Sequence, residues 1–354
     1  MARIRKYLRF PTSVVVLLWL AVSVLSAPSP AGFRLVKATL PSFCGANGAK
    51  CREMITFASG GKVEAYRNVP FSGSARVTHA VIVVHGTGRN AAHYYANMLA
   101  AAAQAGVLDT TIVLAPLFKT SQDSPGAEQL TWTSGGWKIG DAAEAKGVSS
   151  FSVMDDLITT LANKKRFPNL KWITVTGHSA GGQFTQRYAA FGVAPNYVRG
   201  TVVDFVVANP SSYTYFDGAR PSKDGSRFSV PTGSSCPYDD YKYGMGGRTG
   251  YVARLAPREA LHQFTSRRIT YLSGGADSVQ NGDMDTDCGA MAQGPNRVTR
   301  SAYFFARIKQ LAPTAPQQRV VVPGIAHDSD GMYQSAQARP VLFGVGGDIV
   351  GARE

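Results

Sequence analysis

The stretch WITVTGHSAGGQFTQRYAAF, residues 172–191, joins an apolar β-branched run, a serine flanked by glycines and a segment of helical composition. Its run KWITVTG (171–177) predicts a buried strand, and QFTQRYAAF (183–191) predicts a helix. Between them, GHSAG (177–181) has the G-x-S-x-G pattern in which a serine stands on a sharp turn from strand to helix. Small neighbours let such a turn lift the hydroxyl clear of the sheet. We therefore expect Ser179 to be a nucleophile rather than a small residue in a plain glycine-rich connection.

The alternation of strand and helix extends over most of the chain. Short β-branched runs predict strands at 79–86, 110–116, 171–177, 200–210, 267–274 and 318–324. Helical spacing or alanine-rich composition predicts helices at 90–106, 150–166, 183–191 and 296–312. Continuous apolar strands separated by helices predict an α/β fold, with a mostly parallel central sheet and helices on both faces.

Two stretches rich in glycine, serine and aromatic residues interrupt this alternation, at about 119–149 and 209–256. We expect them to be loop insertions over the carboxyl edge of the sheet. A chain of 354 residues with 44% hydrophobic content can bury a sizeable core, and we expect one large domain over residues 32–354.

The N-terminal residues 1–31 predict a secretory signal peptide, cleaved near residue 26 or 31. They combine a basic start, an apolar run from about Val14 to Leu25 and small residues near Ser26 and Ala31. The run is shorter than the roughly 18 residues that cross a bilayer, so no stable membrane anchor is predicted. The mature protein is expected to be secreted, to an extracellular or periplasmic location.

The formal charge of +14 falls to +10 once the four basic residues of this leader are subtracted. No lysine or arginine run alternates with aromatic residues, so the sequence predicts no nucleic-acid partner. Export favours disulfides among the four cysteines. We expect the pairs Cys44 with Cys51 and Cys236 with Cys288; two other pairings, or four buried thiols, are the alternatives. No C-x-x-C spacing indicates zinc.

A serine nucleophile requires a base, normally a histidine held in one tautomer by a carboxylate, and in this fold they follow in the order serine, acid, histidine. His327 lies after the last predicted strand, where its loop reaches the carboxyl edge, and we expect it to be the base. A surface-loop histidine is the alternative reading. The other histidines considered occupy less suitable places: His79, His93, His262, and His178 beside the serine.

The acid is chosen from several aspartates in one loop. Asp277 lies a few residues beyond the strand at 267–274, after a glycine pair that lets the chain turn, and we expect it to be the acid. The later aspartates lie in a polar stretch typical of a solvent-facing loop, and Asp217 lies deep in an insertion. The alternatives are therefore Asp217, Asp283, Asp285 and Asp287.

Two backbone N–H groups are needed to bind the oxyanion. Ala180 follows the nucleophile and supplies the first. Thr87, in HGTGRNA (85–91) between a strand and a helix, is expected to supply the second. A plain glycine turn with Asn90 capping the helix is compatible with this role.

HGTGRNA followed by GHSAGG resembles the secreted α/β-hydrolase esterases grouped with polyhydroxyalkanoate depolymerases and feruloyl or acetyl xylan esterases. The resemblance covers about residues 78–330 and matches at Thr87, Ser179, Ala180, Asp277 and His327. It implies the α/β-hydrolase fold and a Ser-His-Asp carboxylic ester hydrolase without metal or organic cofactor. The insertions depart from the family, so the substrate is not implied. Their aromatic residues could line a cleft or pack within the insertions: Trp132, Trp137, Tyr213, Tyr215, Tyr238 and Tyr241.

DMDTDCG (283–289) is similar to a calcium-binding loop, but Cys288 replaces the required glycine and no closing glutamate follows. We expect a solvated acidic turn and no metal. The sequence as a whole predicts an exported serine esterase acting on an ester substrate, which could be polymeric. A serine peptidase with the same triad, or a non-catalytic secreted binding protein on the same scaffold, remains an alternative.

Overall fold

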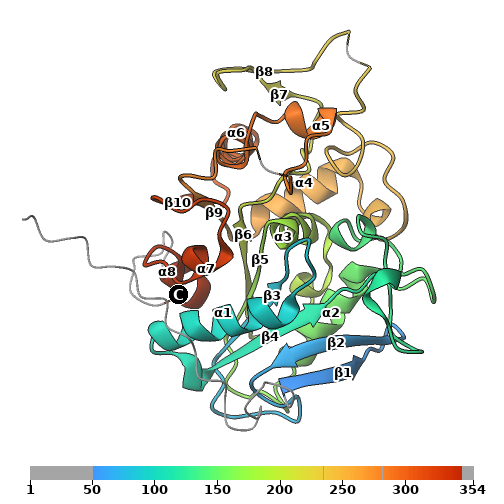
Figure 1. Ribbon diagram of the computed structural model, residues 1–354, viewed down its shortest axis with the longest axis vertical. Helices are drawn as coiled ribbons and strands as arrows, with labels where there is room; N and C mark the ends of the chain where they lie inside the picture. Colours follow the sequence, from blue (N-terminus) through green and yellow to red (C-terminus); the bar gives the residue numbers. More distant parts are fainter. Residues whose placement is uncertain (1–50, 234, 281, 345–354) are drawn as a thin grey trace, which may run out of the picture. The chain divides into compact units, whose positions relative to one another are not determined.

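The computed structural model describes residues 51–344, except 234 and 281. An eight-stranded sheet runs through these residues in the order β1-β2-β4-β3-β5-β6-β9-β10 (Figure 1). Neighbouring strands from β4 to β10 in this order are parallel. β2 is antiparallel to both of its neighbours, β1 and β4. The strands are β1 (Arg52–Thr56), β2 (Lys62–Arg67), β3 (His79–Val84), β4 (Thr111–Leu117), β5 (Trp172–His178), β6 (Val202–Ala208), β9 (Ile269–Gly274) and β10 (Gln317–Val322).

Helices cover both faces of this sheet, as the sequence predicts. They are α1 (Ala91–Gln104), α2 (Ser150–Leu161), α3 (Ala180–Phe191), α4 (Pro257–Ser266), α5 (Cys288–Met291), α6 (Arg297–Leu311), α7 (Ser329–Tyr333) and α8 (Ala338–Phe343). Within the described residues no helix is long and apolar enough to cross a bilayer. The predicted signal peptide and Cys44 lie outside the described residues.

The alternation of side chains along β3 divides the core into two layers. Ala80, Ile82 and Val84 pack in one hydrophobic cluster with α2 and α3. Val81 and Val83 pack in the other, with α1, α7 and α8. Successive strand residues point to opposite faces, so a run that is buried on both faces is apolar throughout.

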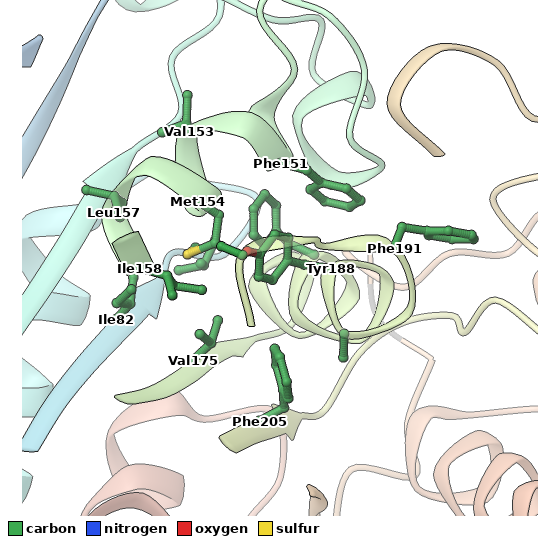
Figure 2. Packing of buried hydrophobic residues seen from close by; sticks show 14 of the residues in the cluster. Ile82, Phe151, Val153, Met154, Leu157, Ile158, Val175, Tyr188, Phe191 and Phe205 are labelled. Carbon is green, nitrogen blue, oxygen red and sulfur yellow. The ribbon is translucent and has the colours of Figure 1, made fainter. Parts of the chain in front are cut away.

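Figure 2 shows the first cluster from close by, where Val175 of β5 and Phe205 of β6 lie beneath α2 and α3. Phe151 of α2 meets Tyr188 of α3 edge to face, with ring centroids 5.5 Å apart. All four side chains are almost completely buried. Aromatic pairs of this geometry add stabilisation beyond the area that they bury. The core therefore fixes α3, and with it the turn that precedes α3, above the centre of the sheet.

Both predicted insertions leave the carboxyl edge, after β4 and after β6. The first contains only short 3-10 turns, at Ser121–Asp123 and Gly136–Lys138. The second contains a small hairpin that the sequence did not predict, β7 (Arg220–Pro221) with β8 (Phe228–Ser229). Because parallel strands all end at this edge, it is where loops from distant parts of the chain meet.

Candidate active site

Ser179 occupies a strained turn between β5 and α3. Its φ of 59° and ψ of −118° lie in a region that residues other than glycine rarely adopt. The Ser179 N–H donates to the carbonyl of Ala208 at 3.0 Å, which ties the turn to the end of β6. Strain of this kind persists only where the surroundings impose it, and it gathers at functional sites. The structure thus places Ser179 on the sharp strand-to-helix turn that the sequence predicts.

Three glycines allow α3 to start this close to the sheet. A Cβ on Gly177 would lie 2.4 Å from the carbonyl of Gly181, and one on Gly181 would lie 2.2 Å from the Val84 oxygen. A Cβ on Gly182 would meet the Ala208 oxygen at 2.4 Å. These contacts are with backbone atoms, which cannot move aside as a flexible side chain can. Backbone packing therefore requires glycine at all three positions.

Asp277 and His327 are hydrogen-bonded to each other at the same edge of the sheet. The loop after β9 carries Asp277, the loop after β10 carries His327, and Oδ2 of the acid lies 2.8 Å from Nδ1 of the imidazole. The Asp277 side chain is only 2% exposed and that of His327 is 14% exposed. A carboxylate at Nδ1 favours the tautomer in which Nε2 is free to accept a proton.

A second partner holds Asp277 from the other side. Arg297, the first residue of α6, places Nη1 3.3 Å from Oδ1 of Asp277 and is itself fully buried. Burial lowers the pKa of Arg297, and the nearby Asp277 carboxylate opposes that shift. A buried carboxylate is costly unless it is paired. Arg297 was not predicted as part of the site, because nothing in the sequence signals that the start of this helix lies beside Asp277.

Asn209, immediately after β6, links several parts of the site. Its Oδ1 accepts the Gly274 N–H at 2.8 Å and its Nδ2 lies 3.3 Å from the Ala326 carbonyl, next to the base. Nδ2 is also 3.3 Å from Nε2 of His178. A polar side chain at the carboxyl end of a predicted strand is the signal that could have identified Asn209 in the sequence.

His178 packs against the ring of His327. Its ring centroid lies 4.5 Å from that of His327. Burial lowers the pKa of His178 well below its usual value, and the charges of His327 and Arg297 lower it further. The neutral ring therefore supports one side of the His327 imidazole.

The competing aspartates have other partners. Asp285 accepts hydrogen bonds from Tyr243 and lies 3.0 Å from Nζ of Lys242, and Asp217 pairs with Arg307. Asp283 and Asp287 are exposed. Among the described residues no cluster of histidine, cysteine or carboxylate side chains could hold a metal ion.

Thr87 and Ala180 both line the pocket that Ser179 opens into. Ala180 is the first residue of α3, so its N–H lacks an intrahelical acceptor and is available to a ligand. Arg89, at a φ of 51°, donates to the Thr87 carbonyl at 3.0 Å and pairs with Asp123 at 2.6 Å. The first insertion thus fixes the loop that carries Thr87.

His85 secures the same loop from below. Its Nδ1 lies 2.9 Å from the Gly86 carbonyl, and Nε2 accepts the Phe118 N–H at 3.0 Å. Burial lowers the pKa of His85 to about 4, so the ring is neutral at neutral pH. This arrangement is that of a structural histidine.

The pocket beside Ser179 has a volume of about 260 Å³ and a strongly polar wall. The charged residues of its wall are Lys138, Arg187, Lys242, Asp283 and Asp285. The aromatic side chains of the insertions are elsewhere, since Trp132, Trp137, Tyr213 and Tyr215 are buried in the hydrophobic core. These four side chains therefore pack in the protein interior and do not line a cleft.

Cys236 of the second insertion forms a disulfide with Cys288 at the start of α5. The bond fastens the insertion to the loop that follows Asp277, close to the contacts of Tyr243 and Lys242 with Asp285. The pairing of Cys44 with Cys51 stays a prediction, because Cys44 lies outside the described residues.

Replacing Cys236 and Cys288 together by serine is expected to lower the free energy of unfolding by about 2–4 kcal/mol, because the closed loop restricts the unfolded chain. Urea unfolding of the wild type and the double variant measures the difference. Dithiothreitol should destabilise the double variant further if Cys44 and Cys51 are bonded. Peptide mapping without reductant should recover both pairs, whereas crossed pairs would refute the assignment.

No protein-family model matches the chain, and no curated protein matches it either. Among solved structures, it is similar to poly(aspartic acid) hydrolase-1 from Sphingomonas sp. KT-1, at 22% identity and a TM-score of 0.60, over 82% of this chain and 97% of that one. It is also similar to LpqC, a poly(3-hydroxybutyrate) depolymerase from Bordetella parapertussis, at 20% identity and a TM-score of 0.58, over 83% and 90% of the two chains. With its mostly parallel sheet covered on both faces, the chain has the α/β-hydrolase fold.

Proposed function

We propose that this chain is an exported serine hydrolase that cleaves carboxylic esters, with Ser179 as nucleophile, His327 as base and Asp277 as acid. The observation that carries the proposal is the 2.8 Å contact between Asp277 and His327, on neighbouring loops at the edge where the strained Ser179 also stands. A buried acid–histidine pair and a serine on a sharp turn are the parts that acyl transfer requires.

In the proposed reaction, Nε2 of His327 takes the proton of the Ser179 hydroxyl as Oγ attacks the ester carbonyl. Negative charge then develops on the carbonyl oxygen, and the N–H groups of Thr87 and Ala180 bind it. The imidazolium, stabilised by Asp277, returns its proton to the departing alcohol and leaves an acyl-enzyme. Water attacks that intermediate by the same route and releases the acid. All of these steps use protein groups, so the proposal includes no metal or organic cofactor.

We also propose that the protein is exported and that its substrate could be a polymer. The leader-like residues 1–31 and the Cys236–Cys288 disulfide suit a protein of an oxidising compartment. Both structural neighbours are named for polymers, so a polymeric ester is a reasonable substrate class to test.

The test is a panel of substrates given to the purified protein: short aryl esters, polyesters, acetylated and feruloylated sugars, and peptides. Ester turnover together with phosphonate labelling of Ser179, located by peptide mass spectrometry, is the expected result. Faster cleavage of peptides would favour the peptidase alternative. A label on another residue would mean that Ser179 is not the nucleophile, and no turnover of any substrate would favour a binding protein that retains only the fold.

A further inference from the structure

The wall of the pocket beside Ser179 contains more cationic than anionic groups close to the nucleophile. Lys242 and Asp285 lie 3.0 Å apart and compensate each other, and Asp283 is exposed to solvent. With Lys138 and Arg187, the wall contains three cationic side chains and two carboxylates.

Arg187 projects from α3 and is fully buried. Its guanidinium hydrogen-bonds only to neutral oxygens in the described part of the chain, those of Thr214, Ser212 and the Lys138 carbonyl, at 3.3–3.4 Å. Burial lowers the pKa of Arg187, and nearby groups that include the Asp285 carboxylate oppose that shift. A buried charge without a counter-ion within ion-pair distance is costly, so an anion that enters the pocket would be bound favourably.

Lys138 lies across the same pocket, in the first insertion. Its Nζ donates to Oγ1 of Thr87 at 3.2 Å, and no described carboxylate forms an ion pair with it. Burial lowers its pKa to about 8, and the charges of Arg187 and Lys242 lower it further while Asp285 opposes them. With a pKa of about 8, Lys138 still carries its positive charge for most of the time at pH 7.

The position of these cations relative to the proposed triad indicates which part of a substrate they would meet. The alcohol must leave toward His327, which supplies its proton. His327 is not among the described residues that line this pocket, whereas Ser179, Ala180 and Thr87 are. Within the proposed reaction, this pocket would hold the acyl group, because its wall contains the nucleophile and both proposed oxyanion donors.

Resting on the proposed function, we infer that the acyl group of the substrate carries a carboxylate, which the half-buried Lys138 binds in this pocket and the positive charge of the buried Arg187 attracts. An ammonium group donates charge-assisted hydrogen bonds to carboxylate oxygens. The substrates are thus half-esters of dicarboxylic acids, or ester polymers whose units carry a free acid.

The test compares two para-nitrophenyl esters of matched shape: the monoester of adipate, which carries a carboxylate, and the 6-methylheptanoate ester, in which an isopropyl group replaces it. We expect the wild type to favour the adipate ester by about tenfold or more in kcat/KM, because its site contains charged groups that a neutral analogue leaves unpaired. Lys138→Gln should lower this preference by about tenfold, and Arg187→Gln should act in the same direction. Lys165→Gln removes an exposed lysine outside the pocket and should leave the preference unchanged. Rates are corrected with Ser179→Ala protein, because the monoester also hydrolyses spontaneously.

Binding to Ser179→Ala protein, measured by calorimetry, tests the inference without turnover and without relying on a folded arginine variant. Adipate should bind more tightly than uncharged adipamide, and Lys138→Gln in this background should remove the difference. Equal turnover of the two esters by the wild type, or equal binding of adipate and adipamide, would overturn the inference while the proposed esterase function stands. Turnover of neither ester, with adipate bound selectively, would refute the esterase function and support the anion site.

Discussion

Ser179→Ala is expected to lower kcat/KM for a short aryl ester by a factor on the order of 10⁶, comparable to the loss when a nucleophile is removed from a working triad. Alanine retains the Cβ that the turn already accommodates at its φ of 59°, so the fold should persist. Steady-state kinetics measure the loss, and thermal unfolding checks the fold. The background rate sets the lower limit of the measurement.

Ser226→Ala is a suitable control, since Ser226 is an exposed serine in the second insertion. It should keep wild-type turnover. Retained turnover in Ser179→Ala would mean that another group is the nucleophile, and the proposed mechanism would have to be abandoned.

Asp277→Asn is expected to lower turnover by about 10⁴, because an amide can hold His327 in the wrong tautomer and cannot stabilise the imidazolium. The substitution also removes the carboxylate charge that pairs with the buried Arg297, so the variant should be less stable than the wild type. Kinetics measured well below the unfolding temperature separate the two effects. The asparagine preserves the size of the side chain, so the surrounding loops should keep their places.

Asp287→Asn is the matched control, because this aspartate lies in the same loop region but is exposed. It should retain nearly full turnover. A nearly active Asp277→Asn together with an inactive Asp287→Asn or Asp285→Asn would show that the acid was misassigned, although an esterase with a different acid would remain possible.

The central sheet could be predicted from the sequence because its strands are buried on both faces and therefore read as uninterrupted apolar runs. The run predicted at 200–210 became β6, Val202–Ala208, and the turn begins at Asn209, whose φ is 41°. The placement of Ser179, Asp277 and His327 at one edge followed from the same logic, since the loops after parallel strands meet there. Their assigned roles still depend on the variants described above.

The two antiparallel strands β1 and β2 and the buried charges were not predictable in the same way. β1 alternates exposed and half-buried residues and has no continuous apolar run, so the pattern used for the central strands did not reveal it. Arg187 looks in the sequence like a solvent-facing residue of an amphipathic helix, yet α3 is buried on all sides. Arg297 contacts Asp277 only because the start of α6 folds back over the acid. Such contacts depend on tertiary packing, which local sequence does not encode.

The residues that line the pocket beside Ser179 come both from the framework around the sheet and from the two insertions. Thr87, Ala180 and Arg187 belong to the framework around the sheet, whereas Lys138 and Lys242 come from the two insertions. During divergence, the insertions can therefore exchange residues and alter which acids are accepted, while the glycine-packed turn stays intact. A directed-evolution library for new substrates should accordingly randomise the insertion positions and leave Gly177, Gly181 and Gly182 unchanged.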